Sequence, residues 1–94
     1  IAVVGEAPYA EGWGDNPNPS LSEADLATIE KTKAKSKKLL VVIVSGRPLD
    51  IAEYSKNWDG VVASWLPGSE AEGITDVLFG LYPFTGTLPV NWDY

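Results

Sequence analysis

The run LLVVIV, residues 39–44, is the strongest structural signal in this chain. It is apolar at every position and rich in β-branched side chains, which is typical of a strand buried on both faces in a parallel sheet. The run IAVV at residues 1–4 has the same character, and GVVASW at residues 60–65 has it in a weaker form. We therefore predict three strands that share one open, mainly parallel sheet.

A helix is predicted between the first two strands. Ala24, Leu26 and Ile29 would lie on one side of it, and Ser20 or Ser22 would cap its N-terminus.

A second helix is predicted after the third strand. Ser69 and Glu72 have the spacing of a capping box at its start, and Gly80 would end it. The resulting order of strand, helix, strand, strand, helix is typical of an open α/β sheet with flanking helices.

The composition narrows the class of protein. The 94 residues suggest one small domain, and a hydrophobic content of 45% excludes a disordered tail. The net charge of −6 argues against nucleic acid or an anionic membrane as the main partner. No apolar run approaches the roughly 20 residues that a membrane-spanning helix needs.

The absence of histidine, cysteine and methionine is informative. Without histidine or cysteine, proton transfer would fall to Asp, Glu, Lys or Tyr, and disulfides are excluded. Methionine is also absent and the chain begins at Ile1, so we expect a fragment or a processed piece of a longer protein.

Unusual loops follow all the predicted strands: GEAPYAEGWGDNPNP at residues 5–19, SGRPLD at 45–50 and LPGSE at 66–70. The carboxyl ends of parallel strands meet at one edge of a sheet, where ligands commonly bind. We therefore expect the charged residues of these loops to lie within reach of one another: Glu6, Glu11, Asp15, Arg47 and Glu70.

The acids at residues 6, 11 and 15 are compatible with several chemistries. Calcium prefers oxygen ligands, but this spacing does not match an EF-hand. Phosphate binding would need a glycine-rich motif or a Walker lysine, and neither is present. We expect no metal and no cofactor.

Glycosidic chemistry fits these residues better. It needs one carboxylic acid beside the leaving oxygen and a second carboxylate on the opposite side. The aromatic rings of Tyr9 and Trp13 suit the apolar faces of sugars. From the residues alone an alternative stays open, in which the acids only cap turns and pair with Arg47.

Several segments of the chain occur in the same order in a known family. They resemble the C-terminal α/β-sandwich domain of glycoside hydrolase family 3, which contains β-glucosidases and β-glucan exohydrolases. The segments are VVGEAPYAEGWGD (3–15), VSGRPL (44–49), ASWLPGSEAEGITDVLFG (63–80) and FTGTLPVNW (84–92). The resemblance runs from Val3 to about Trp92 and implies a flavodoxin-like α/β sandwich. The family's GSEGQG is GSEAEG here, with Ala71 and Glu72 in place of Gly and Gln, which bears on helix capping more than on chemistry.

The resemblance also implies a function. In the exohydrolase-like members the last Glu of the PYAE-type motif is the general acid/base, and that residue is Glu11 here. The family's nucleophile is an aspartate in an S-D-W-type motif on an N-terminal barrel domain, and no aspartate of this chain lies between Ser and Trp. Residues 1–94 are therefore expected to form part of a single sandwich domain, without its first strands and without the barrel. This chain alone is expected to be inactive.

The implied activity is retaining hydrolysis of terminal β-D-glucosyl residues from β-glucosides or β-glucan oligosaccharides, in a secreted or periplasmic protein. The alternative is a non-catalytic carbohydrate-binding or scaffold module on the same fold. In the leading hypothesis Glu6 and Arg47 pair beneath the loop, Asp15 supports it by capping a turn, and Tyr9 and Trp13 contact the sugar.

Overall fold

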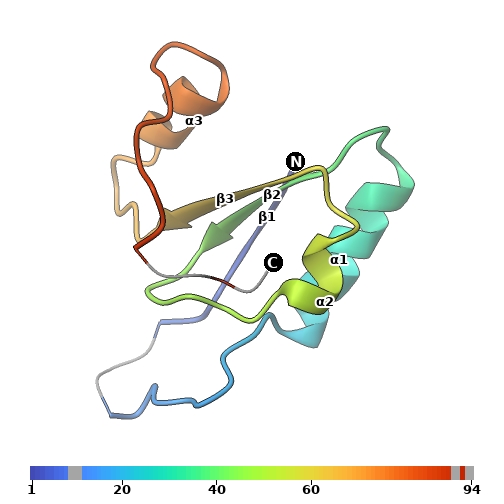
Figure 1. Cartoon of the computed structure of the whole chain (residues 1–94), viewed down its shortest axis with the longest axis vertical. Helices are drawn as coiled ribbons and strands as arrows, with labels where there is room; N and C mark the ends of the chain where they lie inside the picture. Colours follow the sequence, from blue (N-terminus) through green and yellow to red (C-terminus); the bar gives the residue numbers. More distant parts are fainter. Residues whose placement is uncertain (9–11, 90–91, 93–94) are drawn as a thin grey trace.

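A parallel sheet forms the centre of the molecule. The computed structural model describes residues 1–8, 12–89 and 92. In these ranges three parallel strands lie in the order β1-β2-β3, with β1 at Ala2–Gly5, β2 at Leu40–Val44 and β3 at Gly60–Trp65 (Figure 1). The predicted open α/β sheet is confirmed.

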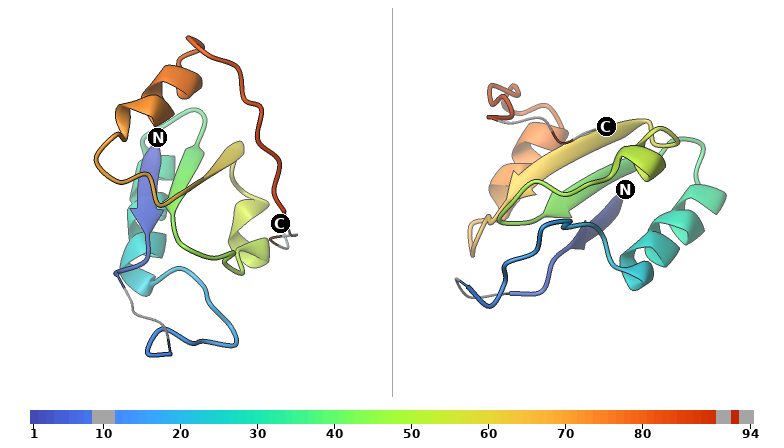
Figure 2. Two further views of the ribbon diagram at one scale, coloured as in Figure 1. Left: turned by 90° about the vertical axis from the view of Figure 1, so that its left-hand side faces the viewer. Right: turned by 60° about the horizontal axis from the view of Figure 1, so that its bottom comes forward.

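The helices lie on both sides of this sheet. α1 (Glu23–Ala34) and α2 (Ala52–Ser55) lie on one side, and α3 (Glu72–Leu78) lies on the other, next to the end of β3 (Figures 1 and 2). The sequence predicted α1 and α3 but missed α2, which has only four residues and therefore shows no helical periodicity. None of these helices is long and apolar enough to cross a membrane.

The core lies between the sheet and the first two helices. The register places Ala2 beside Val41 and Val4 beside Ile43, so that these side chains share one face of the sheet. All of them are buried there together with Ile29 of α1. The loops complete this core with further buried apolar residues: Leu21, Leu39, Leu49, Ile51 and Trp92.

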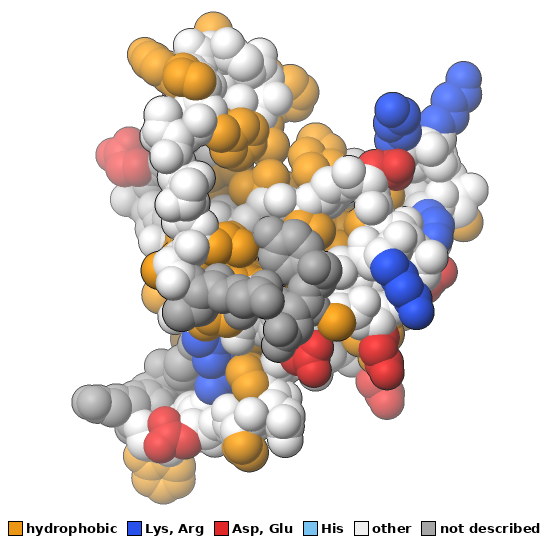
Figure 3. All heavy atoms as spheres, in the orientation of Figure 1, with side chains coloured by type: hydrophobic (Ala, Val, Ile, Leu, Met, Phe, Trp, Pro, Cys, Tyr) orange, Lys and Arg blue, Asp and Glu red, His pale blue; other side chains and the backbone are white. Residues whose placement is uncertain are grey.

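The opposite face of the sheet is covered at β2, where Val42 is 3% exposed, but not at β1. The predicted burial on both faces is therefore wrong for β1. Val3 alternates with the buried Ala2 and Val4 along β1, and its side chain is 64% exposed. Large apolar side chains are also exposed at the end of α3 and in the segment that follows it, where Figure 3 shows hydrophobic surface: Phe79, Leu81, Tyr82 and Phe84. Since parallel strands are normally covered on both faces, this apolar surface is unusual for a complete domain.

The N-terminus of α1 is capped as predicted. Ser22 has an extended backbone (φ −68°, ψ 160°), and its side chain accepts a hydrogen bond from the N–H of Asp25 at 3.2 Å. Of the two serines considered, Ser22 is therefore the cap and Ser20 is not.

The predicted capping box at α3 is wrong. The residue before the helix is Ala71, which already has a helical backbone, and no side chain caps this end. Ser69 lies in a turn that precedes it. The predicted C-terminus is confirmed, because Gly80 has a φ of 85° and donates to the carbonyl of Val77, as in a Schellman motif.

Candidate functional site

The ends of β1 and β2 bring Glu6 and Arg47 together. Glu6 directly follows β1 and its backbone N–H donates to the carbonyl of Val44 at 3.1 Å, which continues the pairing with β2. Arg47 lies three residues beyond the end of β2. Its Nη2 is 2.6 Å from Oε2 of Glu6, and its Nε donates to both carboxylate oxygens at 3.0 and 3.2 Å. The predicted Glu6–Arg47 contact is confirmed.

This ion pair is sheltered from solvent. The exposed fractions of the two side chains are 24% for Arg47 and 14% for Glu6. A guanidinium that binds a carboxylate with two nitrogen atoms has little orientational freedom. The pair therefore fixes the geometry at the start of the loop.

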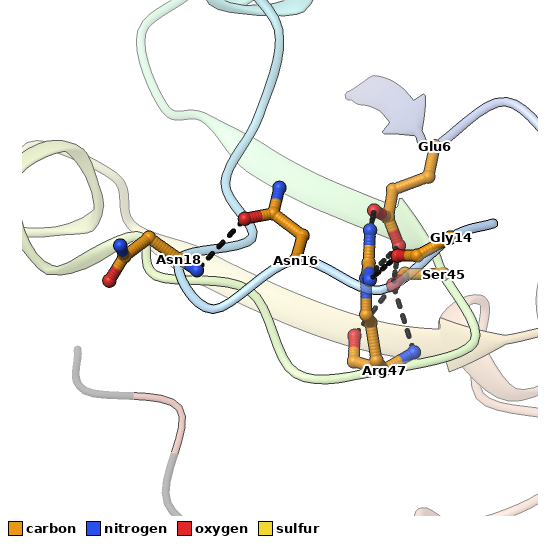
Figure 4. A network of polar contacts seen from close by, with 6 residues as sticks. All are labelled: Glu6, Gly14, Asn16, Asn18, Ser45 and Arg47. Carbon is orange, nitrogen blue, oxygen red and sulfur yellow. Dashed lines mark hydrogen bonds and ion pairs between the residues drawn. The ribbon is translucent and has the colours of Figure 1, made fainter. Parts of the chain in front are cut away.

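Arg47 also binds the far end of the same loop. Its Nη1 donates to the carbonyl oxygen of Gly14 at 2.5 Å (Figure 4). Glu6 and Gly14 lie on either side of residues 7–13 in the sequence, so one side chain holds both ends of this segment. The sequence predicted the contact with Glu6 but could not indicate Gly14, because every residue offers the same backbone carbonyl.

Ser45 is a further member of this cluster that sequence reasoning missed. It follows β2 directly, is 1% exposed, and its Oγ lies 2.9 Å from Oε1 of Glu6. Its position in SGRP, directly after the strand and two residues before Arg47, could have indicated this role.

The described part of the loop consists of turns. Gly12 has a φ of 79°, and its carbonyl accepts the N–H of Asp15 at 3.3 Å. The side chain that closes the next turn is that of Asn16, which accepts the N–H of Asn18 at 2.9 Å. Asp15 is exposed, so the turn-capping role expected for its side chain falls to its neighbour.

Trp13 and Glu70 are not part of this cluster. Trp13 is 93% exposed and projects from the loop. Tyr9 and Glu11 lie outside the described residues. Glu70 is exposed, and no hydrogen bond or ion pair in the described ranges involves its side chain. The expectation that it lies within reach of the other charged residues stays a prediction.

Trp65 at the end of β3 packs against another aromatic ring. Its ring centroid is 5.4 Å from that of Trp92 and the planes meet at 80°. Trp65 has a φ of 56°, and the pairing with β2 shifts by one residue here. A cavity of about 300 Å³ beside these rings has no charged residue in its described lining, and it offers no acid for glycosidic chemistry.

Within the described ranges, no group of three or more His, Cys, Asp or Glu side chains is arranged to hold a metal ion. The polar cluster is instead a carboxylate, a guanidinium and a hydroxyl at the carboxyl edge of a parallel sheet. This is the edge at which open α/β sheets bind their ligands.

The whole chain, residues 1–94, matches the C-terminal domain of glycosyl hydrolase family 3. The chain belongs to this family. It is 33% identical over 94 residues to a periplasmic beta-glucosidase of Salmonella typhimurium, with 98% of this chain and 12% of that protein covered.

Other relatives include a glycosidase of different activity and a second beta-glucosidase. The chain is 31% identical over 84 residues to an exo-alpha-(1->6)-L-arabinopyranosidase of Bifidobacterium longum, with 88% of this chain and 11% of that protein covered. It is 27% identical over 94 residues to a lysosomal beta glucosidase of Dictyostelium discoideum, with 98% of this chain and 11% of that protein covered. The family 3 chain therefore spans about one ninth to one eighth of the length of these relatives.

Proposed function

We propose that this family 3 chain is the acid/base-bearing part of a retaining glycosidase that releases terminal β-D-glucosyl residues, with Glu11 as the general acid/base. The nucleophile would be an aspartate on an N-terminal barrel domain of the same protein. The relatives named as beta-glucosidases match 98% of this chain and those named as arabinopyranosidases match 88%, which supports a glucoside as the substrate.

The observation that carries this proposal is the double anchoring by Arg47. One guanidinium binds the Glu6 carboxylate and the Gly14 carbonyl, and Glu11 lies between these two residues in the sequence. A catalytic acid has to be held within a fraction of an ångström of its productive position. A loop fixed at both ends to the sheet meets this requirement better than a loop that only turns in solvent.

The division of roles among the acids follows from their surroundings. Glu6 is engaged by Arg47 and Ser45, so it is not available to transfer a proton. Asp15 is exposed beside a turn. Glu11 is the remaining carboxyl of this loop.

In the proposed mechanism Glu11 acts twice. It first protonates the glycosidic oxygen while the aspartate of the barrel attacks the anomeric carbon, and the glycosyl–enzyme bond forms as the aglycone leaves. It then removes a proton from the water that attacks this intermediate, which regenerates the acid and releases the sugar. The two carboxyl groups should lie about 5–5.5 Å apart in the assembled site. Tyr9 and the exposed Trp13 would contact the sugar.

The uncovered apolar surface is consistent with this larger assembly. Val3, Phe79, Leu81 and Phe84 are 64–75% exposed, and the chain covers 12% of the Salmonella typhimurium relative. We propose that residues 1–94 form part of one sandwich domain whose other elements cover this surface. The name of the same relative includes the word periplasmic, which favours a secreted or periplasmic location.

The test replaces Glu11 in the full-length protein. Glu11→Ala should lower turnover by about 10²–10⁴-fold on unactivated disaccharides, because general acid catalysis contributes about that much. Activated aryl β-glucosides need less acid assistance, so their first step should lose less. Azide should restore the second step, because it replaces the water and needs no general base.

Asp15→Asn is the matched control and should show neither the leaving-group dependence nor the azide rescue. Near-normal turnover of Glu11→Ala on disaccharides would refute the assignment. A full-length protein that binds glucosides without hydrolysing them would instead support a non-catalytic carbohydrate-binding module.

A further inference from the structure

Ser45 is almost completely buried, with 1% of its surface exposed. Among the described polar and charged residues only one other is buried, Ser55 of α2, which is 8% exposed. Burying a hydroxyl is costly unless its hydrogen bonds are made inside the protein. The contacts of Ser45 therefore indicate what its hydroxyl does.

Ser45 contacts the ends of all the strands of the described sheet. Its Oγ is 2.9 Å from Oε1 of Glu6, which follows β1, and 2.6 Å from the carbonyl oxygen of Arg47 (Figure 4). It also accepts the N–H of Arg47 at 3.1 Å. The backbone N–H of Ser45 donates to the carbonyl of Trp65, the last residue of β3, at 3.1 Å.

These contacts determine how Arg47 is presented to the loop. The hydroxyl has one proton and donates it to one of the two oxygens at a time, while its lone pairs receive the N–H of Arg47. The Ser45 hydroxyl therefore contacts both the carboxylate of Glu6 and the backbone of Arg47. The guanidinium is planar and rigid. The positions of the nitrogen atoms that bind Glu6 therefore determine the position of Nη1, which binds Gly14.

We propose that Ser45 is a positioning residue, whose hydroxyl orients Glu6 and Arg47 so that the guanidinium holds Gly14, three residues after Glu11 in the sequence, at one place beside the sheet. The effect on the loop stands on the contacts alone. The effect on activity rests on the proposed role of Glu11.

The first experiment compares Ser45→Ala with Ser55→Ala in the full-length protein. Both variants remove one buried hydroxyl, but Ser55 lies in α2, outside the cluster. Amide hydrogen exchange reports on the loop directly, because the N–H of Asp15, the residue after Gly14, donates to the carbonyl of Gly12. Ser45→Ala should raise the exchange rate of the Asp15 N–H roughly tenfold or more, and Ser55→Ala should leave it unchanged.

The second measurement is the leaving-group dependence of turnover. A small displacement of a catalytic group can cost up to about 10²-fold in rate. Ser45→Ala should lower kcat roughly tenfold or more on unactivated disaccharides, much less on activated aryl β-glucosides, and leave KM nearly constant. In a Glu11→Ala background, Ser45→Ala should cause no further loss, because residues that act through one group are not additive.

Arg47→Lys tests the same contacts with Glu6 and Gly14 and leaves the buried hydroxyl of Ser45 in place. A lysine keeps the charge beside Glu6 but cannot bind Glu6 and Gly14 together with a rigid fork. It should reproduce the faster exchange of the Asp15 N–H and the leaving-group dependence. It also replaces the first variant if Ser45→Ala does not fold.

The results separate this proposal from the proposed function. Unchanged exchange of the Asp15 N–H in both Ser45→Ala and Arg47→Lys would overturn the positioning role. An equal loss of kcat on both substrate classes, or a loss that persists in the Glu11→Ala background, would overturn the link to the acid/base. Normal activity of Glu11→Ala alone would refute the proposed function and leave the loop result standing.

Discussion

The loops that follow β1 and β3 leave the same edge of the sheet, but they are held very differently. The loop after β1 is bound to its neighbour through the side chains of Glu6 and Arg47 and through the carbonyl of Gly14. In the loop after β3, residues 66–70, no side chain makes a hydrogen bond in the described part of the chain, and Leu66 is 72% exposed.

This difference indicates different roles for the two loops. A loop that must present a catalytic acid requires anchoring to rigid elements. A loop that presents an apolar side chain to solvent is better suited to contact another part of a larger protein. The first loop therefore carries the proposed chemistry, and the second is part of the proposed domain surface.

Removing Arg47 should be the most damaging change to stability. Arg47→Leu leaves the Glu6 carboxylate with an exposed fraction of 14% and without its cation. One-sided removal of a fully buried pair costs about 3–5 kcal/mol, and the partial exposure here favours the lower end of that range. Urea denaturation of the protein should show this loss.

Leu66→Ala is the corresponding change in the other loop. As an exposed surface position it should alter the unfolding free energy by no more than about 0.5 kcal/mol. Equal losses for Leu66→Ala and Arg47→Leu would contradict the contrast between the two loops.

Gly5, the last residue of β1, gives the next largest effect. A Cβ at this position would collide with the carbonyl oxygen of Val44, which is backbone and cannot move aside easily. Gly5→Ala should therefore destabilise the protein by about 1–3 kcal/mol. The measurement is again the midpoint of urea unfolding.

Gly73→Ala in α3 is the matched control on the side of β3. Nothing lies within 4 Å of the position that its Cβ would take, and alanine favours a helix over glycine by up to about 1 kcal/mol. Gly73→Ala should be neutral or stabilising. A stable Gly5→Ala variant would show that β1 and β2 separate more easily at their ends than the register indicates.

The strands and the Glu6–Arg47 contact could be predicted from two general rules about parallel sheets. Continuous apolar runs such as residues 39–44 indicate burial on both faces. Parallel strand ends then have to share an edge, which brings residues 6 and 47 together although they are far apart in the chain.

The missed features depend on local backbone geometry. The spacing of Ser69 and Glu72 fits a capping box, but the motif works only if the serine directly precedes the helix with an extended backbone. Here the helix begins after Ala71, whose ψ of −18° is already helical. The same limit applies to Gly14, whose carbonyl binds Arg47 without any side-chain signal.

The smallest predicted effect compares the two serines that were expected to cap helices. Ser22 accepts the N–H of Asp25 at the start of α1, and losing such a cap typically costs about 1 kcal/mol. Ser69 caps nothing in the described structure. Ser22→Ala should therefore lower the midpoint of urea unfolding measurably, whereas Ser69→Ala should leave it within error, with both measured on the same preparation. A loss for Ser69→Ala as large as that for Ser22→Ala would mean that the capping box forms in solution. In that case α3 would begin two residues earlier, and the turn that separates the loop after β3 from its helix would disappear.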